Sequence, residues 1–385
     1  MLPFFDEDHA SLRAVVRSWV SAQKFPVVET GPDLEEAAVR LVRQLGQQGF
    51  LAYAVPSAFG GKRERVQARD LCILREELAR GSALADSLFA VQALGSYPIA
   101  LAAEDRLKRR YLPPVATGRS IAAFALTEPE AGSDVAALKT TAEKRENRYY
   151  LNGIKRFISN AGIADHYIVF ASSALEKKAK GISAFIVDAA APGLSIQERT
   201  RVLSPHPIGV IAFQDCAVDE NAMLGGEGEG LKIAFATLDL LRCTVGAAAV
   251  GLAQRALEEA IQRSHERRQF GRAIGEFQGI QFKLADMATE LEAARLLVYQ
   301  GAYAHDCAAA DAKRLSSMAK LYATETAQRV IDQGLQIYGG DGVVAGTIME
   351  RLYRDIRALR IYEGTSEIQK LVIARELLKA TGNGH

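Results

Sequence analysis

The length, composition and charge of the chain indicate a soluble protein with more than one domain. Its 385 residues exceed the size of a single ordinary hydrophobic core, so two or three domains are expected. Hydrophobic residues make up 49% and charged residues 24%, as in typical globular proteins. The formal net charge is +1, with no clustered excess of Lys and Arg, which argues against a surface for nucleic acid or anionic lipid.

Two further classes of protein are disfavoured. No apolar run reaches the roughly 18–20 residues of a membrane span, and the acidic N-terminus MLPFFDEDHA lacks the order of a signal peptide. We therefore expect no membrane span and a cytoplasmic location. We also expect no metal site and reduced, mostly buried thiols, because the cysteines are widely spaced and have no neighbouring His at metal spacing: Cys72, Cys216, Cys243 and Cys307.

Residues 1–118 are predicted to form an N-terminal helical domain. Further helices are expected around 71–78 and 83–102, and Pro and Gly residues separate these segments. Apolar residues at helical spacing define one face in each of the first two helices, at Leu12, Val15, Val16, Trp19 and Val20, and at Leu34, Ala38, Leu41, Val42 and Leu45.

The pattern changes near Ile121, where short segments rich in β-branched and aromatic residues begin. They predict a compact, mostly antiparallel and barrel-like β domain at 119–228. Turn signals such as Asn152-Gly153 separate the segments. The expected strands lie within 121–127, 140–144, 149–159, 166–172, 181–188 and 209–213.

Helical periodicity returns near Gly230 and continues to the end of the chain. Long amphipathic segments joined by short loops predict a C-terminal four-helix bundle within 229–385. The expected helices are 231–264, 279–306, 311–338 and 348–357, followed by one that begins near Ser366. The predicted fold class is therefore α+β and multidomain, in the order helices, β domain, helical bundle.

The stretch IYEGTSEIQ at 361–369 places a carboxylate just before a helix. Gly364 permits close approach of backbone to a ligand, and Ser366 and Gln369 have the spacing of a capping box. Glu363 is therefore expected on a tight turn before a helix N-terminus. Such a position suits a base that approaches a substrate, although the helix dipole alone also favours an acid there.

Four motifs, in order and over essentially the whole chain, resemble those of the acyl-CoA dehydrogenase family. They are FALTEPEAGSDV (124–135), KRFISN (155–160), ERRQFGRAI (266–274), and the pair QIYGGDG (336–342) and IYEGTSEIQ (361–369). The resemblance implies an FAD-dependent enzyme that introduces a 2,3-double bond into an acyl-CoA thioester. It also implies the helical, β and helical-bundle domains of that family.

The resemblance implies that the first two motifs hold the flavin ring. The polar edge of a flavin needs fixed donors and acceptors when it is buried, and a turn of small residues at a strand end can supply them. A loop without a ligand, and a plain strand with one inward aromatic, are the structural alternatives. The implied residues are Phe124, Leu126, Thr127, Gly132, Ser133, Phe157 and Ser159.

The later motifs are implied to bind the FAD of a neighbouring subunit, in a dimer that usually belongs to a tetramer, a dimer of dimers. Arg267 can grip pyrophosphate with two parallel hydrogen bonds, or it can simply end a solvated basic helix. The other residues implied to bind FAD are Phe270, Gln278, Gln336, Gly339, Gly340, Thr365 and Glu367.

By the same resemblance, Glu363 is the base that removes the α-proton while a hydride leaves the β-carbon for the flavin. Burial would raise the pKa of this carboxylate toward the working pH. A minority of the family place the base on the long helix instead. This chain has Leu241 there, which cannot take a proton.

The implied substrate site includes Ser133 and Gly364 together with Asp239 and Arg242, which share a helix face. The pair matches residues that meet the CoA arm in the family, although alone it would be an ordinary surface ion pair. The expected carrier of the acyl group is therefore CoA.

The chain departs from the pattern of the family in the segment 200–215 and, in a minor way, at Asp341, where Asn is frequent. Relatives usually carry Gly, a basic residue and Ser or Thr in that segment, where this chain has Ser204, His206 and Ile208. His206 either meets a phosphate or is held in a turn between prolines. Asp86 stands where members that use glutaryl-CoA carry an Arg. A second carboxylate would be repelled there, and a neutral acyl chain is the expected substrate.

The expected electron acceptor is an electron-transferring flavoprotein. Three alternatives keep the fold: an oxidase, a dehydrogenase of thioesters on a carrier protein, and an enzyme that eliminates a β-substituent. A flavin-free scaffold protein is the alternative from a different class. The yellow colour of bound oxidised flavin would exclude it.

Overall fold

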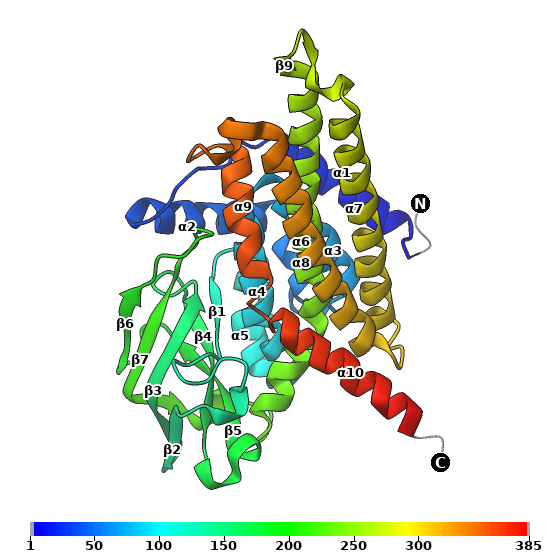
Figure 1. Cartoon of the computed structure of the whole chain (residues 1–385). Coiled ribbons are helices and arrows are strands. Elements are labelled where there is room, and N and C mark those ends of the chain that lie inside the picture. The colour runs from blue at the N-terminus through cyan, green and yellow to red at the C-terminus, as the bar shows by residue number, and fades with distance from the viewer. Residues whose placement is uncertain (1–3, 383–385) are drawn as a thin grey trace. The chain divides into compact units, whose positions relative to one another are not determined.

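A computed structural model of the chain describes residues 4–382, drawn as a ribbon in Figure 1. The chain forms two compact units, each assembled from stretches that are not adjacent in the sequence. The first unit comprises Met1–Phe25, Gln67–Asp86 and Asp239–His385, and the second comprises Pro26–Val66 and Ser87–Leu238. The predicted boundaries at 118/119 and 228/229 divide the chain into consecutive domains instead, and they stay a prediction.

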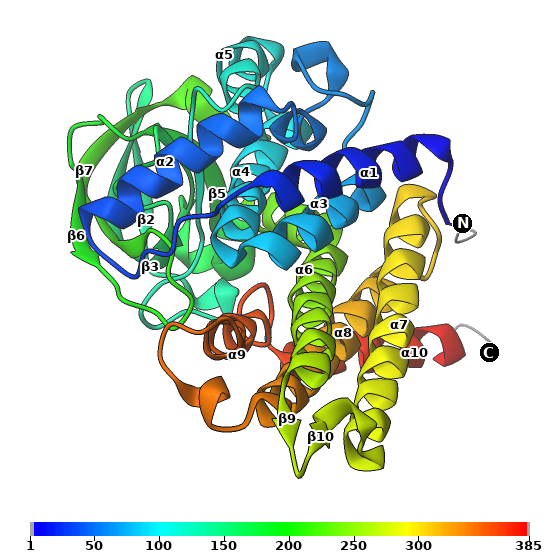
Figure 2. The ribbon, with the colours of Figure 1, turned by 90° about the horizontal axis from the view of Figure 1, so that it is seen from above.

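The first unit is helical. Helix α8 lies between α7 and α9, as Figures 1 and 2 show. The long helices predicted for the C-terminal part are confirmed to within a few residues. The helices of this unit are α1 (Glu7–Ala22), α3 (Ala68–Gly81), most of α6 (Gly230–Glu266), α7 (Gln278–Asp306), α8 (Ala312–Tyr338), α9 (Ile348–Leu359) and α10 (Ser366–Gly382).

Helix α1 shows how the local sequence sets one of these elements. The side chain of Asp6 accepts a hydrogen bond from the N–H of His9 at 3.2 Å and caps the helix. Its buried face contains Leu12, Val16 and Val20. The prediction that Val15 shares this face is wrong, because its side chain is 57% exposed.

The second unit combines helices with an eight-stranded sheet. Its helices are α2 (Pro32–Gln47), most of α4 (Ala83–Ala102) and α5 (Asp105–Ala116). The strands are β1 (Ala122–Ala125), β2 (Thr141–Arg145), β3 (Arg148–Ser159), β4 (His166–Ser172), β5 (Ile182–Asp188), β6 (Leu194–Arg199), β7 (Ile208–Asp219) and β8 (Met223–Leu224).

The strand order is β6-β7-β3-β2-β4-β5-β8, and β1 pairs with β4. The sheet is mostly antiparallel, as predicted, but β1 and β2 pair with β4 in parallel. Strand β6 was not expected, because its sequence LSIQER is mainly polar and exposed. Asn152-Gly153 lies within β3 rather than in a turn, at a shift of its register with β7, and the β2–β3 hairpin turns near Glu146.

Two helices, α4 and α6, are long and apolar enough to cross a membrane by length and composition, contrary to the expectation from the sequence. Most of each apolar window is buried inside the protein, 72% in α4 and 78% in α6. Burial in a protein core accounts for this apolar character, so the length and composition of these two helices are only weak evidence for a membrane span.

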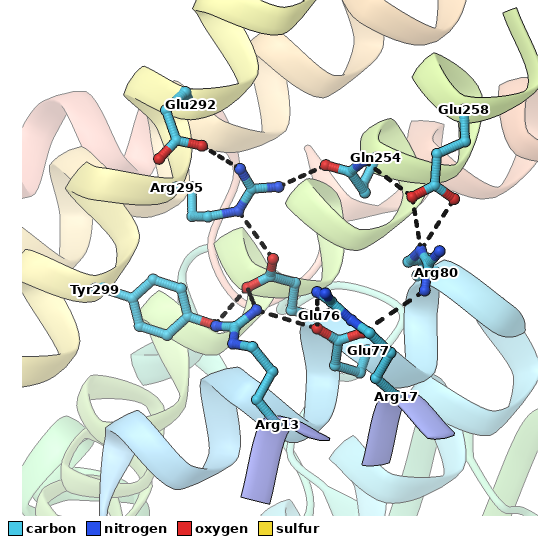
Figure 3. A network of polar contacts seen from close by, with 10 residues as sticks. All are labelled: Arg13, Arg17, Glu76, Glu77, Arg80, Gln254, Glu258, Glu292, Arg295 and Tyr299. Carbon is cyan, nitrogen blue, oxygen red and sulfur yellow. Dashed lines mark hydrogen bonds and ion pairs between the residues drawn. The ribbon is translucent and has the colours of Figure 1, made fainter. Parts of the chain in front are cut away.

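A network of buried charged groups joins α1, α3, α6 and α7 within the first unit (Figure 3). Its centre is Glu76 on α3, which is 3% exposed. Glu76 accepts hydrogen bonds from Nε of Arg295 at 2.9 Å and from the hydroxyl of Tyr299, and Arg13 lies 3.2 Å away. Next to it, the Glu77 carboxylate also binds Arg13. Buried charges are stable only when they are paired, so this network fixes how the four helices meet.

We predict that Glu76→Gln lowers the free energy of unfolding by about 3–5 kcal/mol at neutral pH, because it removes the buried central charge that Arg13 and Arg295 share and leaves them with Glu77 and Glu292 as carboxylate partners. Burial alone would raise the pKa of Glu76, but Arg13 and Arg295 hold it below its ordinary value of 4.5. The stability from ionised Glu76 is therefore present above that value and is lost as pH falls through the lower folded pKa. Urea unfolding at several pH values measures both effects.

The control is Glu292→Gln, which removes a half-exposed carboxylate from the edge of the same network. It should cost no more than about 1 kcal/mol. Equal losses in the two variants would contradict the importance of the buried centre.

Candidate active site

Glu363 lies in the short turn between α9 and α10. Its φ is 52°, in the left-handed region, and Gly364 follows with φ of 87°. A non-glycine residue in this conformation costs about 1–3 kcal/mol, and such strain persists only where the surrounding structure enforces it. The turn predicted before a helix is confirmed, and its strain singles out Glu363.

Side chains from α8 and α10 hold this turn in place. Nζ of Lys320 donates to the carbonyl oxygen of Gly364 at 2.7 Å, and Nε2 of Gln369 donates to the same oxygen at 2.9 Å. The carbonyl oxygen of Gly364 is therefore engaged within the protein, and the predicted role of this residue in substrate binding stays a prediction.

The helix start was predicted correctly, but its cap was not. Oγ1 of Thr365 accepts a hydrogen bond from the N–H of Ile368 at 3.3 Å. Ser366 is the first residue of α10, and its hydroxyl donates to Glu325 at 2.6 Å. The predicted capping box from Ser366 to Gln369 is wrong, because Thr365 takes the capping role. Glu367, also predicted to bind FAD, is exposed.

The carboxylate of Glu363 is nearly buried, with 9% of the side chain exposed. Oε2 has no hydrogen-bond partner among residues 4–382, and Oε1 lies 4.0 Å from Nη1 of Arg75. Burial raises the pKa of Glu363, although the charges of Arg75, Lys320 and Arg242 oppose this effect. A desolvated carboxylate with an unused oxygen can take a proton from a ligand.

Arg75 on α3 is fully buried beside this carboxylate. Its Nε and Nη2 donate to the two oxygens of Asp86 at 2.8 and 2.9 Å, and its Nη1 donates to Oγ1 of Thr244 at 3.0 Å. Asp86 therefore forms a bidentate ion pair that offsets its charge, and the expected repulsion of a substrate carboxylate stays a prediction.

Sequence reasoning missed both Arg75 and Lys320. Arg75 falls on the apolar helix face of Leu71, Leu74 and Leu78 in LCILREEL, and Lys320 lies among apolar and small residues in SSMAKLYA. Burial lowers the pKa of Lys320 to about 8, and the nearby carboxylate of Glu363 opposes this. A buried cation within an apolar pattern is the signal that would have identified both.

Asp239 and Arg242 share a face of α6, as predicted. Nη1 of Arg242 lies 2.6 Å from Oδ1 of Asp239, and Lys313 lies 3.9 Å from the other oxygen. Arg242 is buried, and its charge reaches Glu363. Leu241 between them is buried and carries no titratable group. The pair and the predicted base thus lie within the first unit, where one substrate can meet both.

In the second unit, the fold brings the first two motifs together. The N–H of Arg156 on β3 donates to the carbonyl of Thr127 at 2.9 Å. Nζ of Lys155 donates to the carbonyl of Leu126 at 3.1 Å and pairs with the buried Glu128 at 2.8 Å. These contacts fix the end of β1 against β3, although about 30 residues separate them in the sequence. Sequence reasoning missed the Lys155–Glu128 pair.

Phe157 lies where β3 bulges, between Lys155 and Ile158. Its φ is 56° and its side chain is 48% exposed. A large aromatic held outward in the left-handed region is an outlier that indicates a binding role.

The other residues predicted around the flavin lie in β1, at the end of β3 and in the turn after β1. Ser159 contacts His206 at 3.1 Å, and Phe124 packs against Phe170 with ring centroids 4.9 Å apart. Gly132 and Ser133 are exposed, and a Cβ added at Gly132 would meet no atom within 4 Å. This turn therefore leaves room for a ligand close to the backbone.

A two-stranded hairpin, β9 (Arg268–Gln269) and β10 (Arg272–Ala273), lies at the end of α6 and α7 (Figure 1). At its tip Phe270 is 93% exposed with φ of 52°, and Gly271 follows with φ of 81°. Arg267 and Gln278, on either side of the hairpin, are also exposed. An aromatic displayed in this way on a strained turn suits contact with another molecule.

The QIYGGDG motif lies at the same end of the first unit. Arg263 of α6 pairs with Asp341 and lies over the ring of Tyr338, with 5.3 Å between guanidinium and ring centroid. Gln336 is exposed, and a Cβ added at Gly339 or Gly340 would meet nothing within 4 Å. The predicted binding residues of the two motifs are thus gathered there, apart from the cluster around Glu363.

Neither a metal site nor a disulfide is found in the described part of the chain. Residues 4–382 contain no group of three or more His, Cys, Asp or Glu side chains able to hold a metal ion. Three of the cysteines are buried, as expected, and Cys307 is exposed.

Three models of the acyl-CoA dehydrogenase family match the chain in order. The N-terminal domain model matches residues 6–119, the middle domain model 123–216 and the C-terminal domain model 228–378. A 3-(aryl)acrylate reductase of Clostridium sporogenes is 40% identical over 98% of this chain and all of its own length. The chain belongs to the acyl-CoA dehydrogenase family.

Other members of the acyl-CoA dehydrogenase family are similar over nearly the whole chain. An acyl-CoA dehydrogenase of Bacillus subtilis is 39% identical, covering 97% of this chain and 99% of its own. A subunit of the caffeyl-CoA reductase–Etf complex of Acetobacterium woodii is 37% identical, covering 98% of this chain and 100% of its own.

Two solved structures of acyl-CoA dehydrogenases have the same fold. Butyryl-CoA dehydrogenase from Megasphaera elsdenii superposes with a TM-score of 0.90 at 32% identity, covering 97% of this chain and 99% of its own. An acyl-CoA dehydrogenase from Bacillus anthracis complexed with FAD superposes with a TM-score of 0.88 at 31% identity, covering 99% of this chain and 68% of its own.

Proposed function

We propose that this member of the acyl-CoA dehydrogenase family is an FAD-dependent enzyme that introduces a 2,3-double bond into an acyl-CoA thioester. The observation that supports this most strongly is the carboxylate of Glu363, which is nearly buried, has an unused oxygen and lies in a strained turn. A desolvated carboxylate on a strained backbone lowers the stability of the folded protein, and a role in catalysis explains why the chain retains it.

In this mechanism Glu363 removes the α-proton, which the neighbouring thioester carbonyl acidifies. When bound, FAD supplies the acceptor for the hydride that leaves the β-carbon. Burial raises the pKa of Glu363, which strengthens it as a base, and the charges of Arg75 and Lys320 limit this rise. Lys320 and Gln369 also hold the turn, so the base keeps one position.

We assign the flavin ring to the second unit, at the residues of the first two motifs. Backbone groups of Leu126 and Thr127, the hydroxyls of Ser133 and Ser159, and the exposed ring of Phe157 match the donors, acceptors and stacking surface that a flavin needs. The Bacillus anthracis relative, solved with FAD, is consistent with this cofactor. The domain boundaries at 118/119 and 228/229 belong to the same proposal.

The proposed substrate is a neutral acyl group on CoA, bound through Asp239, Arg242 and Ser133. The positive charge of Arg75 is already balanced by its bidentate pair with Asp86, so this guanidinium offers no unbalanced charge to a distal carboxylate of the substrate.

A second candidate is the same chemistry in the reductive direction. Relatives at 37–40% identity are named as reductases of arylacrylate, caffeyl-CoA and acryloyl-CoA. Glu363 would then return a proton to the α-carbon, which its raised pKa also suits. Faster reoxidation of the reduced protein by an enoyl-CoA than reduction by the saturated thioester would favour this direction.

The proposed electron partner is an electron-transferring flavoprotein, since one relative is named as part of a complex with Etf. We also propose a dimer of dimers in the cytoplasm, in which the exposed hairpin with Arg267 and Phe270 reaches the FAD of a neighbouring subunit. The hairpin exposes a guanidinium suited to phosphate and an aromatic ring, and it is distant in sequence from the two motifs assigned to the flavin ring. Both features fit such an arrangement.

We predict that Glu363→Gln binds FAD normally but reduces the rate of substrate-driven flavin bleaching by at least about 10²–10⁴-fold, because the general base is lost. Anaerobic stopped-flow absorbance with acyl-CoA measures this rate. Glu376→Gln, which changes a partly exposed glutamate on the following helix α10, is the control and should bleach as the unmodified protein does. Near-normal bleaching in Glu363→Gln would refute the proposed function.

We predict that Arg267→Ala lowers FAD occupancy and loosens the oligomer together, because a ligand that needs two chains stabilises their association by mass action. Flavin absorbance and sedimentation velocity measure the two effects. Arg272→Ala, on β10 of the same hairpin, is the control. A monomer of the unmodified protein that is fully loaded with flavin would exclude this assembly.

We predict that a neutral acyl-CoA bleaches the flavin faster than glutaryl-CoA and faster than the same acyl group on a carrier protein. The first comparison depends on the engaged guanidinium of Arg75, and the second on Asp239 and Arg242. Initial rates of anaerobic bleaching over this panel decide both. A preference for either alternative would overturn the assigned substrate class.

A further inference from the structure

The end of strand β3 is joined to the loop that precedes β7. Ser159 and Ile208 are partners in the β3–β7 register, and the N–H of Asn160 donates to the carbonyl of Pro207 at 2.7 Å. The side-chain amide of Asn160 donates to the carbonyl of Ala122 at 2.9 Å. Backbone contacts therefore hold this junction, and the side chain of His206 is not needed to close it.

The surroundings of His206 determine which of its ring nitrogens carries hydrogen. Nδ1 lies 2.9 Å from the carbonyl oxygen of Ser204, which can only accept, so Nδ1 carries the hydrogen. Burial lowers the pKa of His206, although the hydrogen bond to Ser204 opposes this. The ring is therefore neutral near pH 7, and Nε2 is an acceptor.

This tautomer of His206 determines the direction in which the hydroxyl hydrogen of Ser159 points. Nε2 of His206 lies 3.1 Å from Oγ of Ser159, and an unprotonated nitrogen can only accept there. The hydroxyl hydrogen of Ser159 therefore points at His206. In its other directions Oγ offers lone pairs, so it acts as an acceptor to any third group.

We propose that His206 is a positioning residue that makes Ser159 a hydrogen-bond acceptor toward the flavin and thereby favours the reduced cofactor. The inference rests on the proposed function, which assigns Ser159 to the flavin ring, and on the resemblance to the family, by which Ser159 matches a hydroxyl residue near the reactive nitrogen of the flavin. That nitrogen has a lone pair in the oxidised flavin and becomes an N–H when it receives a hydride. An acceptor hydroxyl pairs with the N–H and not with the lone pair, and no proton leaves Ser159.

The test is the equilibrium between oxidised and reduced flavin in the FAD-loaded protein, measured anaerobically against a redox dye. His206→Leu should retain FAD and decrease the ratio of reduced to oxidised flavin at a fixed potential by about 2- to 10-fold, the effect of one hydrogen bond. A tenfold change corresponds to roughly 30 mV for a two-electron couple.

Three further variants separate this role from a purely structural one. In His206→Gln the amide oxygen can still accept from Ser159, and most of the lost ratio should return. In Ser159→Ala, adding His206→Leu should cause no further change, because His206 acts through the hydroxyl. Ser195→Ala removes an exposed hydroxyl from β6 of the same sheet and should leave the equilibrium unchanged.

An unchanged equilibrium in flavin-loaded His206→Leu, or additive effects of the two substitutions, would overturn the inference. If His206→Leu does not retain FAD, the His206→Gln and Ser159→Ala proteins decide instead: a shift in His206→Gln as large as that in Ser159→Ala would refute the role. Failure of the unmodified protein to bind flavin would refute the proposed function itself, so the two failures are distinguishable.

Discussion

The central physical constraint in this protein is the desolvation of one carboxylate. Removing Glu363 from water raises its pKa, and the protein leaves one of its oxygens without a hydrogen-bond partner among residues 4–382. Three cations surround the group, and each is itself buried: Arg75, Arg242 and Lys320. Their positions depend on α3, α6 and α8, so the helical architecture of the first unit determines how basic Glu363 is.

Backbone strain marks the candidate sites independently of charge. In the part of the chain that the structure describes, eight non-glycine residues have a positive φ, and three of them are Phe157, Phe270 and Glu363. Each was predicted from its motif to bind cofactor or to act as base. Strain of this kind needs support from its surroundings, here the β3 bulge, the β9–β10 hairpin and the turn held by Lys320.

The sequence predicted the long helices and most strands, because their hydrophobic periods are strong and their ends carry clear signals. Helical spacing also predicted that Asp239 and Arg242 share a face and that Glu363 lies on a turn before a helix, whereas their roles in the site were implied by the resemblance to the family. It could not predict that Arg75 neutralises Asp86, or that His206 meets Ser159, because these pairs form only when segments distant in sequence pack together. Strand β6 was missed because its polar sequence lacks an apolar pattern.

The most direct test of the central claim is exchange of the substrate α-proton with solvent. The FAD-loaded protein is incubated with an acyl-CoA in D₂O, and deuterium at the α-carbon is measured by mass spectrometry. We expect exchange in the unmodified protein, with an apparent pKa above the ordinary 4.5 of a glutamate, and none above background in Glu363→Gln. Exchange that persists in Glu363→Gln at the unmodified rate would contradict the assignment of Glu363 as the base.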